Sequence, residues 1–154
     1  MKKIRIFMIS LSFIALLSII FAAVPAADAP TPFFAKLSED GIQRIEIKLD
    51  NYSYDPNYIV VVVNKPVELT LKNVAKIVPH NFTINQPEAG INVNENVQPG
   101  KEAKVSFTPT KTGTFDFFCG VSGIFGSHKK KGMVGTLSVV ETMVPEAGIE
   151  PAQK

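Results

Sequence analysis

The chain has few of the residue types from which reactive sites are usually built. Its 154 residues include one cysteine and two histidines, and there is no tryptophan. A single cysteine excludes a disulfide within the chain. Cys119 must therefore be a buried inert thiol, half of an intermolecular bridge, or a ligand. The residue types near Cys119 in the sequence indicate which of these roles applies.

Strong helix patterns are scarce after residue 40, whereas valine, isoleucine, threonine and eleven phenylalanines are present. These residue types favour strands, and apolar side chains alternate with polar ones in several short runs. Turn-rich segments over 51–57 and 85–100 are predicted to be surface connections. We therefore predict an all-β domain, a Greek-key β-sandwich or barrel. The predicted strands cover 42–49, 58–63, 67–72, 80–84, 103–107, 114–119 and 133–141.

The N-terminus has the pattern of an export signal. A positive start is followed by an apolar run from Ile6 to Val24 and then by small residues. We predict that residues 1–27 are a signal peptide, cleaved between Ala26 and Ala29. The apolar run is nearly long enough to cross a membrane, so an uncleaved anchor is the alternative. The protein is expected outside the cytoplasm, for example in a periplasm.

The remainder of the chain divides into three predicted parts. Residues 28–40 contain two prolines and are expected to form a linker. Residues 41–142 hold all the predicted strands and form the domain. Residues 143–154 are polar, with two prolines, and are predicted to be a disordered tail.

The net charge gives no reason to expect nucleic-acid binding. The whole chain carries a formal charge of +2, and Lys2, Lys3 and Arg5 all lie in the leader, which has no acidic residue. Subtracting these three charges from +2 leaves −1 for the mature protein. The basic character therefore belongs to the export signal.

Four side chains are predicted to meet in one site: His80, Cys119, His128 and Met133. Side chains two apart on a strand point the same way. His80, Cys119 and Met133 each share strand parity with apolar neighbours, so they should face the interior.

A thiolate, two imidazoles and a thioether match a single copper ion held by two histidines and a cysteine, with a weak axial methionine. Zinc fits less well because a thioether is a poor zinc ligand. A binuclear copper centre needs two bridging thiolates, which one cysteine cannot supply.

These motifs resemble those of the cupredoxins, the family of plastocyanin and azurin. The matching residues are Pro79–Phe82, Phe117–Cys119, His128, and Gly132–Gly135 running into the last strand. The resemblance implies that the fold is of the cupredoxin type and that the metal is one type 1 copper ion. It implies His80, Cys119 and His128 as strong ligands, Met133 as the axial ligand, and Asn81 as a tie between the ligand-bearing loops.

The loop between Cys119 and His128 departs from the family pattern. Eight residues separate the two ligands, more than in plastocyanins or azurins, and the segment contains three glycines. This difference could change the position of the exposed edge that we expect for His128.

We expect a protein that is not an enzyme and that carries single electrons between redox partners. Lys129–Lys131 would steer an acidic partner toward His128, with Ile124 and Phe125 giving apolar contact. A solvated loop is the plain alternative for these lysines. A copper carrier or storage protein and a small copper-dependent redox enzyme are the alternative functions. Membrane association is expected only if the leader is retained.

Overall fold

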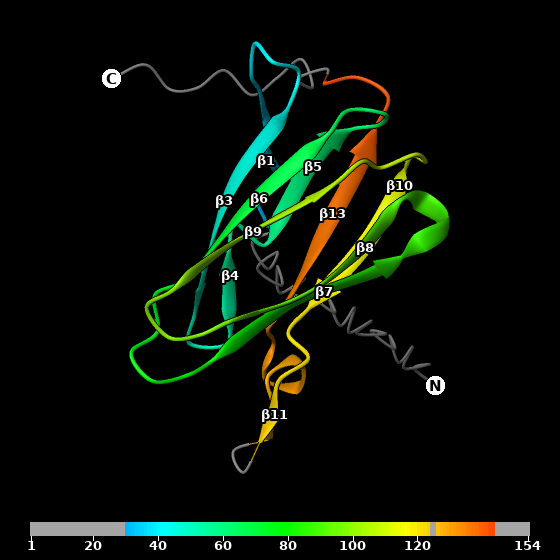
Figure 1. Ribbon diagram of the computed structural model, residues 1–154. Coiled ribbons are helices and arrows are strands. Elements are labelled where there is room, and N and C mark those ends of the chain that lie inside the picture. The colour runs from blue at the N-terminus through cyan, green and yellow to red at the C-terminus, as the bar shows by residue number, and fades with distance from the viewer. Residues whose placement is uncertain (1–29, 124–125, 144–154) are drawn as a thin grey trace, which may run out of the picture.

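Two β-sheets pack face to face to form a sandwich (Figure 1). The computed structural model describes residues 30–123 and 126–143. The larger sheet has the strand order β1-β5-β13-β10-β7-β8. Its members are β1 (Phe33–Phe34), β5 (Tyr58–Val62), β7 (His80–Gln86), β8 (Ile91–Val97), β10 (Gly113–Phe118) and β13 (Val134–Val140).

The second sheet has the order β2-β3-β6-β9, with β4 paired to the far end of β3. Two strands of a separate ribbon, β11 and β12, extend from one end of the sandwich (Figure 1). Two single-turn 3₁₀ helices, η1 and η2, complete the described structure. The bounds are β2 (Lys36–Leu37), β3 (Gln43–Asp50), β4 (Ser53–Asp55), β6 (Val67–Asn73), β9 (Glu102–Phe107), β11 (Ser122–Gly123), β12 (Gly126–Ser127), η1 (Pro87–Ala89) and η2 (Lys129–Lys131).

The core lies between the sheets because the strands alternate as the sequence predicted. In β3 every second residue is buried, and β6 repeats this pattern beside it in parallel register. Among the described residues, the chain passes from one sheet to the other between β1 and β2, β4 and β5, β5 and β6, β6 and β7, β8 and β9, and β9 and β10. The predicted all-β Greek-key fold is confirmed, and all seven predicted strands are present within a residue or two of their expected limits.

Three segments expected to lack strands contain them. The predicted linker 28–40 includes β1, which pairs with β5, and β2, which pairs with β3. The predicted connection 51–57 includes β4. The predicted loop 85–100 includes β8, which pairs with β7 along its whole length. Asparagine disfavours strands, and three asparagines in β8 hid the alternation of its buried residues, Ile91, Val93 and Val97.

The two ends of the chain are the places where a leader and a tail were predicted. The predicted leader 1–27 and residues 144–154 of the predicted tail lie outside the described residues. Met143, the first residue assigned to the tail, packs against the core and is half-buried. Within the described ranges, no helix has the length and apolar character needed to cross a membrane.

One close approach in the core depends on glycine. A Cβ placed on Gly135 would lie 2.3 Å from the Phe117 ring and 2.6 Å from the backbone oxygen of Asn57. Gly135 in β13 is the register partner of Phe117 in β10, so the ring occupies the space that a side chain would need. This arrangement leaves Phe117 fully buried two residues before Cys119.

We predict that Gly135→Ala lowers the free energy of unfolding by about 1–3 kcal/mol, because the core must shift to admit the methyl group. Urea unfolding of the metal-free protein measures this change. Gly123→Ala is the matched control, since a Cβ at Gly123 meets no atom within 4 Å. Equal stabilities for the two variants would show that the contact between Gly135 and Phe117 is not tight.

Candidate metal centre

The four predicted site residues lie at the ends of strands, at the end of the sandwich that carries the β11–β12 ribbon. His80 opens β7, Cys119 follows β10, His128 precedes η2 and Met133 precedes β13. Their exposed fractions are 0% for His80, Cys119 and Met133 and 5% for His128. All four side chains are thus withdrawn from solvent, although they come from separate parts of the chain.

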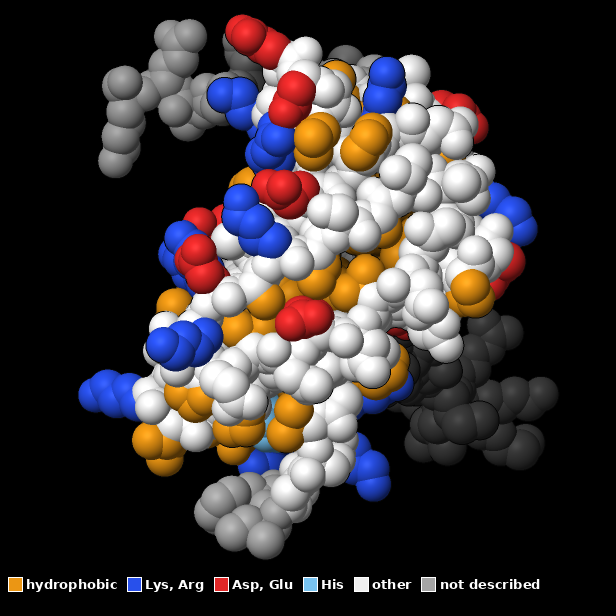
Figure 2. Space-filling view, in the orientation of Figure 1, with side chains coloured by type: hydrophobic (Ala, Val, Ile, Leu, Met, Phe, Trp, Pro, Cys, Tyr) orange, Lys and Arg blue, Asp and Glu red, His pale blue; other side chains and the backbone are white. Residues whose placement is uncertain are grey.

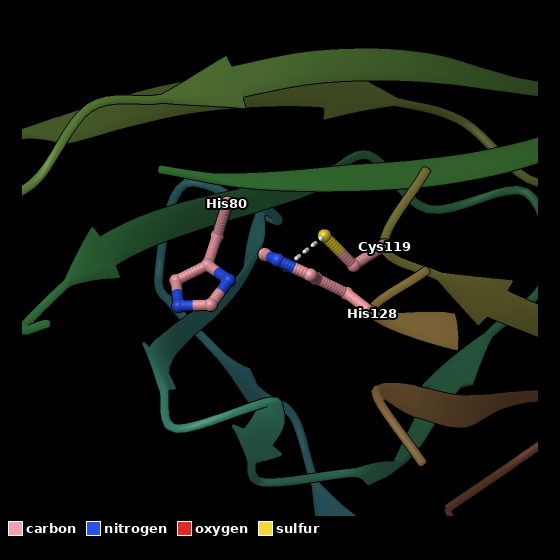
Figure 3. A group of neighbouring side chains, drawn as sticks. All are labelled: His80, Cys119 and His128. Atoms are coloured by element: carbon pink, nitrogen blue, oxygen red, sulfur yellow. Dashed lines mark hydrogen bonds between the residues drawn. The ribbon is translucent and has the colours of Figure 1, made fainter. Parts of the chain in front are cut away.

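Three of these side chains point toward one another (Figure 3). The donor atoms of His80, Cys119 and His128 all lie within 4.8 Å of one another. The Cys119 Sγ atom is 3.4 Å from Nδ1 of His128, and the two imidazole ring centroids are 5.2 Å apart. This is the only such cluster of possible metal donors among the described residues.

His80 has no polar partner for either ring nitrogen among the described residues. A fully buried polar atom without a hydrogen bond costs roughly 1–3 kcal/mol, so such atoms in folded proteins need an explanation. A metal ion bound between His80, Cys119 and His128 would accept a nitrogen lone pair from each ring. The donor set, one thiol with two imidazoles, fits copper and suits a hard cation such as Mg²⁺ poorly.

The surroundings of both histidines favour the neutral form, which is the form that binds metals. Burial, helped by the nearby His128, lowers the pKa of His80 from 6.5 to about 4. Burial and the Lys131 ammonium also lower the pKa of His128. Both rings therefore offer lone pairs at neutral pH without first having to lose a proton.

Asn81 joins the segment that carries His80 to the segment that carries Cys119. Its backbone N–H donates to Cys119 Sγ at 3.3 Å, and its side-chain oxygen accepts the N–H of Gly120 at 3.1 Å. Its side-chain nitrogen donates to the side-chain oxygens of Asn94 at 2.9 Å and Asn96 at 3.2 Å. The tie expected for Asn81 is present, and strand β8 holds its amide in orientation.

An aromatic cluster supports this junction from the core. The Tyr54 hydroxyl donates to the backbone oxygen of Asn81 at 2.6 Å. The Tyr54 ring lies 5.8 Å from the Phe82 ring and 5.1 Å from the Phe117 ring, and the two phenylalanines are 4.7 Å apart. Such aromatic pairs each add about 0.5–1.5 kcal/mol beyond their burial. The backbone at Asn81, next to His80, is therefore packed against an aromatic cluster in the core.

The long loop between Cys119 and His128 is closed by backbone hydrogen bonds. Cys119 N–H donates to the Met133 oxygen at 3.1 Å, Met133 N–H to the His128 oxygen at 3.0 Å, and His128 N–H to the Val121 oxygen at 3.0 Å. Beyond Val121 the chain continues into the paired strands β11 and β12. The additional residues thus extend outward as a ribbon and leave the ligand-bearing ends joined.

The edge of His128 that reaches the surface is small. The side chain is 5% exposed, and the Tyr52 ring meets it edge-on with centroids 4.7 Å apart. Figure 2 shows only a small area of histidine surface, between hydrophobic side chains and lysines. Tyr52 lies in the β3–β4 turn, far from His128 in sequence, and no local motif pointed to it.

Two of the three predicted steering lysines have aromatic partners. The Lys129 ammonium lies 4.0 Å from the centroid of the Phe118 ring, and the Lys131 ammonium lies 4.1 Å from that of Tyr52. All three lysines are exposed in η2. Ile124 and Phe125, the predicted apolar contacts, lie outside the described residues.

The sequence matches the model of the cupredoxin-like domain family over residues 12–135. Because the match covers well over half of the chain, the protein belongs to this family, as its motifs predicted. No curated protein matches the sequence. The family and the donor set together define one copper ion as the cofactor.

Solved structures with the same fold support this classification. The metal-binding domain of the Cu(I)-exporting P-type ATPase CopA from Streptococcus pneumoniae D39 superposes with a TM-score of 0.57 at 24% identity, covering 73% of this chain and 99% of that one. An auracyanin from Roseiflexus castenholzii gives a TM-score of 0.54 at 22% identity, covering 63% and 96% of the chains. Auracyanin A from Chloroflexus aurantiacus gives a TM-score of 0.53 at 21% identity, covering 65% of this chain and 100% of that one.

We predict that the metal-free protein loses stability as the pH falls below neutral. His80 takes up its proton near pH 6.5 when unfolded but near pH 4 when folded. Below pH 6.5 the unfolded state therefore binds a proton that the folded state excludes, so the free energy of unfolding is unaffected above pH 6.5 and falls as the pH decreases toward 4. The total loss is roughly 3 kcal/mol.

Urea unfolding of the metal-free protein between pH 7.5 and pH 5 measures this slope. A His80→Gln variant, which has no titrating group at this position, is expected to show a shallower slope. Equal slopes in the two proteins would contradict the neutral burial of His80.

Proposed function

We propose that the protein is an exported, mononuclear type 1 copper protein that transfers single electrons between redox partners and has no enzymatic activity. His80, Cys119 and His128 are the strong ligands in this proposal, and Met133 is the axial ligand. The observation that carries it is the convergence of a buried thiol and two buried imidazoles, one of which has no other polar partner among the described residues.

Bound copper would supply a one-electron couple between Cu(II) and Cu(I). The residues of the chain would hold the donor atoms in nearly the same place in both oxidation states. The Asn81 tie and the backbone bonds among Cys119, His128 and Met133 restrict movement of these donors. Small movement means little reorganisation on electron transfer, which favours a fast reaction.

The solved structures of similar fold suggest two related functions. Auracyanin A is described as a "blue" copper protein, whereas the CopA domain was solved with Cu(I). A copper carrier must exchange its metal, which is easiest with exposed ligands. Here the three donor side chains are at most 5% exposed, which supports retention of copper and electron transfer rather than delivery. The same burial argues against an enzyme, because a substrate would need an open coordination position.

The proposed partner is a redox protein with an acidic docking surface. Lys129–Lys131 place three positive charges beside the buried ligand His128 and would attract such a partner. No nucleic acid is expected to bind. Export, with an extracytoplasmic or periplasmic location, depends on the leader sequence. Membrane attachment depends on retention of that leader.

We predict that the two sulfur residues have different effects on a Cu(II) titration. Cys119→Ser should remove the intense thiolate-to-copper absorption and most of the copper affinity. Met133→Leu should keep copper and the absorption but raise the reduction potential, because only the weak axial bond is lost. Absorption spectroscopy and voltammetry measure these changes. An unchanged potential in Met133→Leu would remove Met133 from the ligand set, and an unchanged spectrum in Cys119→Ser would refute the proposal.

We predict that the lysines beside His128 govern reaction with charged redox agents. Replacing Lys129, Lys130 and Lys131 with glutamine should slow oxidation of the reduced protein by hexacyanoferrate(III), an anion, by roughly tenfold at low salt. The salt dependence should flatten as well. Stopped-flow absorption measures both effects. Lys111→Gln, in the turn before β10 at the opposite end of the sandwich, is the control. Equal rates for the two variants would contradict electrostatic steering by this cluster.

A further inference from the structure

Tyr52 occupies a backbone position that normally requires glycine. Asp50 and Ser53 are register partners at the ends of β3 and β4, so Asn51 and Tyr52 form a two-residue hairpin turn. Both have positive φ, 41° for Asn51 and 66° for Tyr52. Turns of this kind favour asparagine followed by glycine. Asn51 fits that preference, but a bulky aromatic residue in the left-handed region is uncommon and strained.

The strained turn places the Tyr52 ring against the metal site. The ring meets His128 edge-on, with centroids 4.7 Å apart and planes at 77°. Tyr52 is half-buried and packs against the core, while His128 remains only 5% exposed. Strain held at one residue in this way is a recognised sign of a functional position.

Lys131, which comes after His128 in the chain, contacts the Tyr52 ring. Its ammonium lies 4.1 Å from the Tyr52 ring centroid, within the range of a cation–π interaction. Lys130, the adjacent residue of η2, is also exposed but makes no cation–π contact among the described residues. The contacts of Tyr52 therefore join the β3–β4 turn of one sheet to the His128 loop of the other.

We propose that Tyr52 is a cap over the His128 ligand, which restricts the access of water, chelators and copper-exchanging proteins to the metal, and that Lys131 holds this cap closed. The inference rests on the proposed copper site for its consequence, slow exchange of copper. The covering of His128 itself is a property of the chain and exists without metal. The cap would make this protein retain its copper and would leave the Tyr52 ring as the outer surface met by a redox partner.

Access to His128 can be measured in the metal-free protein by reaction with diethyl pyrocarbonate, which modifies neutral imidazoles. Mass-spectrometric mapping follows His128 and uses the fully buried His80 as an internal reference. Tyr52→Gly should raise the rate at His128 at least tenfold while glycine keeps the turn. Tyr52→Phe should behave like the wild type because it retains the ring. Lys131→Gln should give a smaller increase, and Lys130→Gln should give none.

The same variants are then loaded with Cu(I), and transfer of copper to the chelator bathocuproine disulfonate is timed. Transfer from Tyr52→Gly should be at least tenfold faster than from the wild type and from Tyr52→Phe. If wild-type His128 reacts as fast as N-acetylhistidine, or if Tyr52→Gly leaves both rates unchanged, the cap is refuted. If the modification rates follow the prediction but no variant binds copper, the cap stands and the proposed function fails. If Tyr52→Gly does not fold, equal rates for Lys131→Gln and Lys130→Gln would refute the cap.

Discussion

The metal centre depends on the junction that Asn81 makes between two segments far apart in sequence. Its backbone N–H donates to the Cys119 sulfur, and its side chain accepts the N–H of Gly120. Asn94 and Asn96 accept hydrogen bonds from that side chain and orient it, and the Tyr54 hydroxyl donates to the backbone oxygen of Asn81. Because His80 is the neighbour of Asn81, one residue sets the distance between the first imidazole and the thiol.

The donors themselves are kept at some cost to the fold. His80 is fully buried with both nitrogens unpartnered among the described residues, and the Tyr52 turn adds strain of about 1–2 kcal/mol. Binding of copper would reduce the first cost, because one nitrogen of each imidazole would gain a ligand bond. The geometry thus connects stability to metal binding. The same burial that destabilises the metal-free protein would exclude water from the metal.

Much of this arrangement could be predicted from the sequence, because alternation within a strand is a local property. The inward direction of His80 and Cys119 followed from parity with Phe82 and Phe117, and the residue types indicated copper. Strand β8 was missed because asparagines masked its period. The cover over His128 was missed because Tyr52 reaches it only through the packing of two sheets. The predicted leader lies outside the described residues, and the ligand roles and the redox partner stay predictions.

The central claim is that one copper ion is bound by the Cys119 thiolate and by the imidazoles of His80 and His128. X-ray absorption at the copper edge of the protein loaded with one equivalent of metal tests it most directly. The account predicts a first shell of one short copper–sulfur distance and two copper–nitrogen distances. A shell of nitrogen and oxygen alone would contradict it, because the only cysteine would then not be a ligand.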